Sequence, residues 1–204
     1  MNREADGYPL AGVARRVVHT VEEYLALDRD AEIKSEYRAG EIVAITHRDG
    51  YPGASRVHVA IVGNIMASLV LQLRGRPCQA FSSDLRVRAA SSSRYTYPDI
   101  TVVCGQQIVE NTKPETLLNP TVLVEVLSDS TEAYDRGEKF AHYRRIPSLT
   151  DYVLVAQDRA YVEGIWLYRA LEGRGATLAL PNLDCTLALN DVYDKVEFPA
   201  AGTP

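Results

Sequence analysis

Two carboxylates occupy strand positions where an acidic side chain is costly. Glu125 stands inside the apolar segment TVLVEVLS (residues 121–128), and Asp99 follows Pro98 at the start of the preceding predicted strand. Two buried carboxylates about 4 Å apart repel by roughly 4 kcal/mol at an effective dielectric constant of about 20, and one proton or a divalent metal relieves that repulsion. Hard oxygen ligands favour Mg²⁺ or Mn²⁺. If the two strands are neighbours, the pair therefore predicts a metal site.

Each carboxylate taken alone has a simpler interpretation. Glu125 could turn to solvent or form an ion pair with an arginine such as Arg86. Structural ion pairs perturb the pKa of acids as often as catalytic sites do. Asp99 could do no more than form a turn, since proline often opens strands. Only the combination of the two residues supports a functional prediction.

A lysine on the following predicted helix is the third candidate. Asp135, Lys139 and Tyr143 are four residues apart and share one helix face. If that face lies near the strand of Glu125, the lysine would position a water molecule or stabilise a phosphorane-like transition state. The alternative is an exposed Asp135–Lys139 pair of small energetic value, which we favour in the absence of the two carboxylates.

Other polar side chains give weaker signals. His58 lies on an apolar helix stripe, which is typical of a core or capping histidine rather than of a ligand. Ser82, Ser83 and the serines at 91–93 lack the glycines of a nucleophile elbow, and no phosphate-binding glycine loop is present. Hydrolase triads and nucleotide-binding folds are therefore set aside.

Hydrophobic periodicity predicts the elements that must position these residues. A capping box that begins at Thr20 predicts a short helix ending near Asp28, and Ala39-Gly40 predicts the turn of a β-hairpin. Apolar spacings of three and four predict a helix from Ser55 to Arg74.

The second half of the chain continues with strands and one further helix. Three strands are expected in 79–89, 97–105 and 120–128, the first with one wet face and the third buried on both faces. A helix from about 130 to 145 follows, and then strands in 151–156 and 161–170. The order is helix, three strands, helix and strand, preceded by the short helix and the hairpin, which predicts an α/β (α+β) fold.

Composition indicates one soluble domain without identifying its function. The 204 residues, 46% of them hydrophobic, suffice for a single domain at 18–197, with a flexible arm at 1–17 and a tail at 198–204. The formal charge of −5 offers no overall attraction to nucleic acid, so a polyanion would need a local basic patch. The candidates for that patch are Arg86, Arg88, Arg94, Arg136, Arg144 and Arg145.

Cysteine usage and hydropathy indicate the cytoplasm. Cys78, Cys104 and Cys185 are well separated and include no C-x-x-C pair, which predicts neither a disulfide framework nor a zinc ribbon and favours a reducing compartment. The N-terminal segment lacks the apolar core of a signal peptide, and no apolar run approaches the length of a membrane span.

Five short motifs together carry a resemblance to a known family. They are E-Y-R-A-G-E at 36–41, Y-P-D at 97–99, V-E-V-L-S at 124–128, D-x-x-x-K-x-x-x-Y at 135–143 and D-Y-V-L-V at 151–155. In their order and approximate spacing, from about Val18 to Val192, the chain resembles the Uma-two family of putative restriction endonucleases. That family belongs to the PD-(D/E)XK nuclease superfamily. The resemblance implies the restriction-endonuclease-like core of helix, three strands, helix and strand, in which a mixed central sheet is flanked by helices.

The resemblance also implies roles for individual residues. It makes Asp99 and Glu125 the metal ligands, Lys139 the catalytic lysine and Glu36 an additional acid near the metal. Asp84 resembles another position that is often acidic in the family. Leu127 stands where the wider superfamily has its lysine, so the implied function requires that the ammonium of Lys139 reach the neighbourhood of Glu125.

The leading hypothesis is a Mg²⁺- or Mn²⁺-dependent endonuclease that hydrolyses DNA, for which a homodimer is one arrangement the sequence allows. An inactive nuclease-fold binding or interaction module is the alternative. A phosphodiesterase acting on RNA or small nucleotides would use the same residues.

Overall fold

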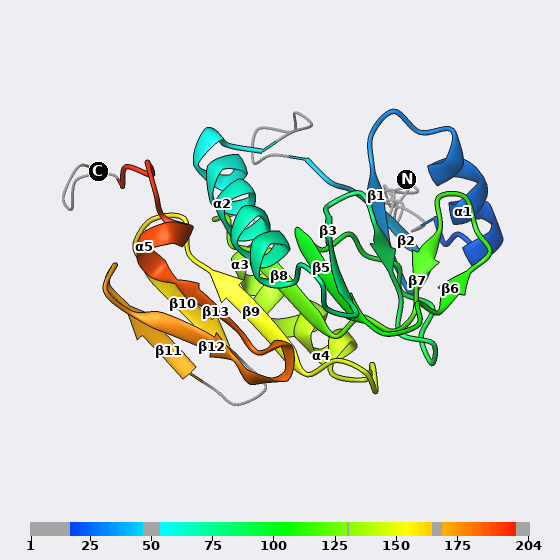
Figure 1. The fold of residues 1–204 in the computed structure, drawn as a ribbon. Coiled ribbons are helices and arrows are strands. Elements are labelled where there is room, and N and C mark those ends of the chain that lie inside the picture. The colour runs from blue at the N-terminus through cyan, green and yellow to red at the C-terminus, as the bar shows by residue number, and fades with distance from the viewer. Residues whose placement is uncertain (1–16, 47–53, 130, 165–168, 199–204) are drawn as a thin grey trace, which may run out of the picture.

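Six strands form one mixed sheet at the centre of the computed structural model, which describes residues 17–46, 54–129, 131–164 and 169–198 (Figure 1). In chain order the elements are α1 (Val21–Arg29), β1 (Ser35–Arg38), β2 (Glu41–Ala44), α2 (Arg56–Gln72), β3 (Cys78–Ser82), β4 (Arg86–Val87), β5 (Ile100–Cys104), β6 (Val109–Glu110), β7 (Thr116–Leu117), β8 (Val122–Val126), α3 (Glu132–Tyr134), the π-helical turn η1 (Asp135–Lys139), α4 (Phe140–Tyr143), β9 (Asp151–Val155), β10 (Tyr161–Gly164), β11 (Arg169–Glu172), β12 (Thr177–Leu180), the 3₁₀ turn η2 (Pro181–Leu183), β13 (Cys185–Ala188) and α5 (Leu189–Val192).

The central sheet has the order β11-β10-β9-β8-β5-β3, in which β8 and β9 are parallel and the other neighbours are antiparallel. The segment from α2 to β9 therefore follows the predicted order of helix, three strands, helix and strand. Parallel pairing of β8 and β9 is possible because the helical segment between them crosses from one end of the sheet to the other. This confirms the mixed sheet flanked by helices.

Both faces of the sheet are covered, as the branched residues of β8 predict. Val122, Val124 and Val126 pack on the face covered by α2, α5 and the β12–β13 hairpin. The alternate residues Leu123 and Leu127 pack on the opposite face, beside Tyr143 of α4. Because side chains alternate along a strand, Glu125 points to this second face, towards the helical segment that follows β8.

The N-terminal helix and hairpin form where the sequence predicts them. Thr20 caps α1 through a complete capping box with Glu23. In the hairpin, Ala39 and Gly40 both have positive φ, 51° and 104°, the conformation that tight turns between twisted strands require. Register pairs Glu36 with Val43, so these two side chains share a face of the hairpin.

The first core strand differs from the prediction. The segment expected as one strand at 79–89 divides into β3, in the central sheet, and β4, which pairs with β7 in a separate three-stranded sheet. Arg86 was expected on a wet face, but its side chain is fully buried and pairs with Asp28 at 2.7 Å. An alternating pattern cannot reveal a buried arginine, because the acid that neutralises it lies 58 residues earlier in the chain.

The helix expected from about 130 to 145 is also less regular than predicted. Its first turn is α3, with Thr131 at the N-cap, its middle is the π-helical turn η1, and its last turn is α4. Residue 130 lies outside the described residues. A π turn carries one more residue than an α turn and is frequent at functional sites. Here the turn contains Asp135 and ends at Lys139.

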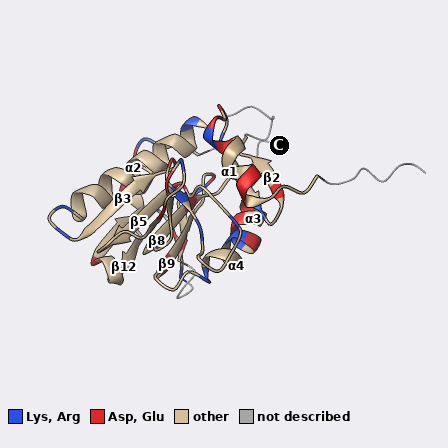
Figure 2. Ribbon diagram, turned by 90° about the vertical axis from the view of Figure 1, so that its right-hand side faces the viewer, with Lys and Arg blue, Asp and Glu red and all other residues tan. Residues whose placement is uncertain are grey.

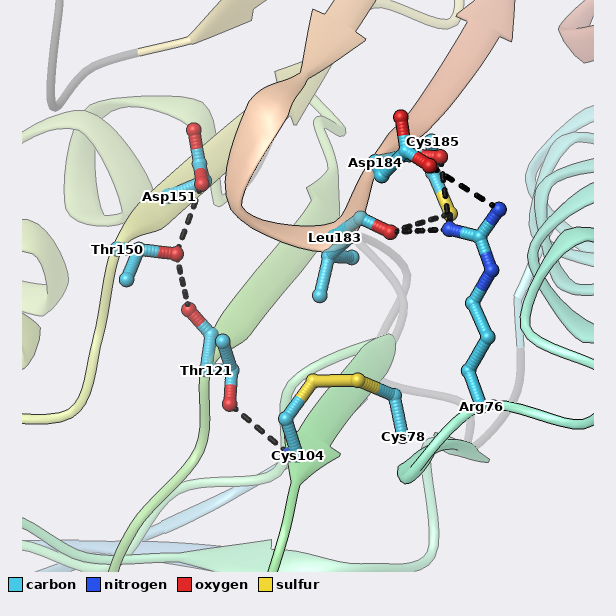
Figure 3. Close-up of a disulfide and its surroundings, with 9 residues drawn as sticks. All are labelled: Arg76, Cys78, Cys104, Thr121, Thr150, Asp151, Leu183, Asp184 and Cys185. Carbon is cyan, nitrogen blue, oxygen red and sulfur yellow. Dashed lines mark hydrogen bonds and ion pairs between the residues drawn. A yellow bond between two sulfur atoms is a disulfide. The ribbon is translucent and has the colours of Figure 1, made fainter.

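A disulfide joins Cys78 and Cys104, which the sequence analysis did not predict (Figure 3). The two cysteines face each other across the β3–β5 ladder, at the end of β5 that is opposite Asp99. Cysteine spacing alone suggested no framework, because strand pairing rather than sequence distance brings them together. Cys185 is a buried free thiol.

Among the described residues, no helix has both the length and the apolar character needed to cross a membrane. The predicted arm lies outside the described residues except for residue 17, as do residues 199–204 of the tail and residues 165–168 of the last predicted strand.

Candidate active site

A cavity of about 980 Å³ opens at one end of the central sheet. It lies where β5 begins and where the parallel strands β8 and β9 end, and it is bounded by the β1–β2 hairpin, the first turns of α2, and the α3–η1 segment. Its lining includes all four residues for which the sequence predicts a site role: Glu36, Asp99, Glu125 and Lys139.

Strand pairing brings Asp99 and Glu125 to the same edge. The β5–β8 register pairs Ile100 with Val124, so Asp99 stands one rung further, opposite Glu125. The backbone N–H of Val126 donates a 2.7 Å hydrogen bond to Asp99 Oδ2, which fixes the aspartate against the end of β8. The neighbouring strands that the sequence analysis required are thus present.

Glu125 is buried and held by two donors. Its Oε1 lies 2.9 Å from Lys139 Nζ and accepts a 3.1 Å hydrogen bond from the hydroxyl of Tyr143. Among the described residues, no protein group bonds to the second oxygen, Oε2. Lys139 thus reaches Glu125, which is the contact that the resemblance requires.

Lys139 is shared by three carboxylates. Besides Glu125, its ammonium lies 3.3 Å from Glu36 Oε1 and 3.3 Å from Asp135 Oδ1, and its side chain is only 7% exposed. Burial opposes its charge, but the three acids outweigh burial and hold the pKa of Lys139 well above its usual value. The lysine stays charged inside the protein.

Glu36 reaches this cluster from the hairpin, 103 positions before Lys139 in the sequence. Its Oε2 accepts hydrogen bonds from Arg38 at 2.9 and 3.2 Å. Burial favours the neutral form of Glu36, but Lys139 and Arg38 together outweigh burial and lower its pKa. Glu36 is therefore an ionised acid that helps to hold the lysine.

The cluster has more acids than bases. Asp99, Glu125, Glu36 and Asp135 face two permanent cations, Lys139 and Arg38, which leaves a formal charge of −2 when His58 is neutral. Burial, reinforced by the charges of Asp135 and Asp99 and offset in part by Lys139, raises the pKa of Glu125 well above its usual value. Burial also raises the pKa of Asp135. The arrangement favours an added positive charge, either a proton or a cation.

His58 belongs to the site although the sequence analysis assigned it to the core. Its Nε2 lies 3.0 Å from Asp99 Oδ1, and its ring lines the cavity. The apolar stripe did place the ring on the correct side of α2. It could not reveal that this part of α2 passes the start of β5, because their packing is a long-range contact.

Two other predictions fall outside the cluster. Asp84 is exposed and pairs with Lys34 at 2.7 Å, and it does not line the cavity. Most of the predicted basic patch is neutralised within the protein, since Arg86 pairs with Asp28, Arg88 with Glu110, Arg94 with Glu138, and Arg136 with Glu132 and Glu163. Arg144 and Arg145 are exposed.

The donor set suits a hard divalent cation of low protein coordination. Within the described residues, no group of three His, Cys, Asp or Glu side chains is arranged to hold a metal. Mg²⁺, however, usually binds through one or two carboxylates and keeps several waters or substrate oxygens. Asp99 and Glu125 supply two hard carboxylates on one cavity wall, inside a cluster with excess negative charge. The residues present therefore fit Mg²⁺ or Mn²⁺.

Comparison with known proteins yields a family, two relatives and similar solved structures, one of which is given below. The family model Uma2, described as "Putative restriction endonuclease", matches residues 21–192. Two uncharacterized proteins of Synechocystis sp. are similar to the chain: one is 34% identical over 173 residues (81% of this chain, 94% of the relative), and the other is 32% identical over 187 residues (87% and 92%).

One of the solved structures is a crystal structure of a putative nuclease belonging to DUF820 from Anabaena variabilis. It matches with a TM-score of 0.65 and 19% sequence identity, over 88% of this chain and 99% of that chain. This likeness confirms the restriction-endonuclease-like fold predicted from the sequence.

Proposed function

Since the chain belongs to the Uma2 family of putative restriction endonucleases, we propose that it is an endonuclease that hydrolyses DNA phosphodiester bonds with a divalent metal ion held by Asp99 and Glu125. The observation that carries the proposal is the 2.9 Å contact between Lys139 Nζ and Glu125 Oε1. One lysine and two carboxylates line the same cavity, so possible ligands for a metal lie beside a fixed positive charge, and both can assist phosphodiester hydrolysis.

Asp99 and Glu125 would hold the metal, and the Mg²⁺ or Mn²⁺ would supply Lewis-acid neutralisation of the scissile phosphate and a more acidic bound water. Both carboxylates have the capacity to bind. A carboxylate oxygen accepts more than one contact, and Oε2 of Glu125 has no protein partner among the described residues.

The chain's own residues supply the rest of the electrostatics. Lys139 is charged, nearly dry and held between Glu125, Glu36 and Asp135, so its ammonium is fixed before substrate arrives. A preorganised cation of this kind can orient a nucleophilic water or stabilise charge that develops on a phosphate oxygen. Glu36 and Asp135 hold the lysine in place, and neither needs to contact the substrate.

Cations at the cavity lining support a phosphate-bearing substrate. Lys34, Arg38 and Arg159 all line the cavity. Each also contacts an acid, at 2.7 Å for Asp84, 2.9 Å for Glu36 and 3.0 Å for Asp158, so a phosphate would have to share or replace that acid. Contacts between such cations and phosphate oxygens would position a nucleic-acid backbone without reading its sequence.

The test is cleavage of supercoiled plasmid, linear duplex and single-stranded DNA, and RNA by purified protein with Mg²⁺ or Mn²⁺, and with a chelator as the blank. We expect metal-dependent cutting of DNA. Glu125→Gln, Asp99→Asn and Lys139→Met should each reduce the rate by about 100-fold or more, the scale of losing one preorganised electrostatic group.

Asp184→Asn is the matched control, because it removes an acid that also belongs to an ion pair, with Arg76 at 3.4 Å, but does not line the cavity. We expect its rate to stay within about twofold of the wild type, the range of a surface change. A protein that cuts none of these substrates with either metal would contradict the proposed activity. Cutting of RNA alone would replace DNA as the substrate.

One observation favours the alternative, a nuclease-fold module without catalysis. The polar contacts of Asp99 and of Glu125 Oε1 are satisfied within the protein, and the described residues offer no three-residue metal cage. Calorimetric titration with Mn²⁺ separates the two functions. The proposed endonuclease should bind the metal, and the inactive module should not. In such a module, Asp99→Ala would affect stability alone, because it removes the acceptor of the Val126 N–H and there is no metal binding or cleavage to lose.

A further inference from the structure

One helix carries a polar side chain into the cavity from an otherwise uncharged segment. Between Arg56 and Arg74 the sequence of α2 contains no Lys, Arg, Asp or Glu, and Figure 2 shows this helix without charged residues along most of its length. His58 lies in its first turns, with a side chain that is 17% exposed and Nε2 3.0 Å from Asp99 Oδ1. An apolar side chain would suit the helix equally well, so the contact with Asp99 is the distinctive property of this position.

The opposite ring nitrogen of His58 faces Gln157, in the turn that follows β9. Gln157 Nε2 lies 2.6 Å from the carbonyl of Leu127 and 3.5 Å from His58 Nδ1. Because a carbonyl only accepts, the amide must present its NH₂ group to this side. Its Oε1 accepts a 2.8 Å hydrogen bond from Ser55 Oγ, which is consistent with that orientation.

This arrangement selects one tautomer of the neutral ring. Nδ1 faces a donor, so it is the acceptor, and the hydrogen is on Nε2, where the Asp99 carboxylate accepts it. Ser55 also caps α2 by accepting the N–H of His58, so the same residue fixes the helix start and the amide. Ser55, Gln157 and His58 thus form one chain of hydrogen bonds that ends on Asp99.

We propose that His58 is a positioning residue for the metal site, with Gln157 fixing its ring. His58 Nε2–H holds Oδ1 of Asp99 while the Val126 N–H holds Oδ2, so the aspartate is restrained from α2 and from β8. A carboxylate restrained at both oxygens loses little conformational freedom when it binds a cation. Partners of this type commonly change metal affinity by about 10–100-fold. The inference rests on the proposed function, because it assumes that Asp99 binds the metal.

The test is calorimetric titration of the metal-free full chain with Mn²⁺, accompanied by thermal unfolding of each variant. We expect His58→Leu to weaken Mn²⁺ binding about 10–100-fold. His58→Gln places an amide nitrogen near the position of Nε2 and should restore the affinity to within about threefold of the wild type, since a replaced donor recovers most of the effect.

Asn64→Leu is the matched control on the same helix. Asn64 donates two 3.0 Å hydrogen bonds, to the carbonyls of Val192 and Asp194, and does not line the cavity. Its loss should lower thermal stability and leave Mn²⁺ affinity unchanged. A residue that merely anchors α2 would behave like Asn64, so this variant separates a positioning role from a structural one.

The outcomes distinguish failure of the inference from failure of the proposed function. A wild type that binds Mn²⁺ together with a His58→Leu variant of equal affinity would overturn the role of His58 only. A His58→Gln variant as weak as His58→Leu would do the same, because the restored donor would then be irrelevant. A wild type that binds no Mn²⁺ overturns the metal site and the inference with it. If His58→Leu does not fold, Gln157→Leu is tested in its place. A weaker Mn²⁺ affinity of this variant supports the chain of hydrogen bonds, and an unchanged Mn²⁺ affinity contradicts it.

Discussion

Two buried ionic clusters lie side by side in this protein and differ in their balance of charge. In the first, Arg86 is fully buried and pairs with Asp28, and its remaining donors reach the hydroxyls of Thr116 and Thr112 and the carbonyl of Pro114. In the second, a single ammonium, Lys139, is shared by Glu36, Glu125 and Asp135. The first is one cation with one anion, whereas the second has an excess of acid.

The difference separates a structural cluster from a candidate site. Buried charges are tolerated when they are paired and hydrogen-bonded, which describes the cluster around Arg86. The cluster around Lys139 is completed only by an added positive charge. The Y-P-D motif (residues 97–99) connects the two clusters. The Tyr97 hydroxyl donates a 2.7 Å hydrogen bond to Asp28, and Asp99, two residues later, lines the cavity. The balanced cluster thus anchors the segment that carries Asp99 to the cavity.

The largest expected effect tests the balanced cluster. Arg86→Met should lower the free energy of unfolding by about 3–5 kcal/mol, because it leaves the carboxylate of Asp28 buried without its cation. Urea denaturation of the metal-free protein measures this loss. Arg88→Met is the control, since Arg88 pairs with Glu110 at 3.0 Å in a partly exposed position and should cost about 1 kcal/mol or less. Equal losses in the two variants would show that Arg86 has no special structural role.

The next effect tests whether the acidic cluster takes a cation. Mn²⁺ at about 100 times its dissociation constant should raise the free energy of unfolding by about 2.7 kcal/mol, since it binds the folded state alone. Thermal unfolding with and without the metal measures the gain. Glu125→Gln should lose most of it, whereas Asp184→Asn should keep it. A gain of equal size in Glu125→Gln would place the cation elsewhere.

The smallest expected effect is the loss of stability caused by the excess of acidic side chains around Lys139. Without metal at neutral pH, Glu125→Gln should be about 1 kcal/mol more stable than the wild type, a common gain when a strained functional site is relieved. The folded protein raises the pKa of Glu125 above its unfolded value of about 4.3. The stability that this proton contributes is fully present below the unfolded pKa and is lost as pH rises through the folded pKa.

The free energy of unfolding of the wild type should therefore decrease relative to that of Glu125→Gln as pH rises above about 4.3. Lys139 does not reverse this trend, because its pKa is raised and its contribution is lost only in strongly alkaline solution. Chemical denaturation at several pH values in the presence of a chelator checks the difference. A variant that is less stable than the wild type at every pH would mean that Glu125 is a favourable partner of Lys139, and the contrast between the two clusters would fail.

Local patterns were sufficient for much of the fold. The capping box at Thr20, the Ala39-Gly40 turn and the apolar spacing of α2 each depend on residues within a few positions of one another, and each appears in the structure. The helix predicted through Lys139 is present from Glu132 to Tyr143, but its π turn was not predicted, because a π turn depends on how the helix packs and not on its own spacing. The missed disulfide has the same origin, since the β3–β5 register sets the distance between Cys78 and Cys104.

The chemistry available to this protein follows from its residues alone: an aspartate at the start of a predicted strand, a glutamate inside the next one, and a lysine four residues from Asp135. The order of elements also follows from them, because hydrophobic periodicity is a local property. Long-range packing set the three contacts that the local pattern could not: Lys139 with Glu125, Glu36 with Lys139, and His58 with Asp99. These contacts join residues up to 103 positions apart in the sequence. They form because the sheet brings the ends of β5, β8 and β9 to one cavity, where buried charges must find partners.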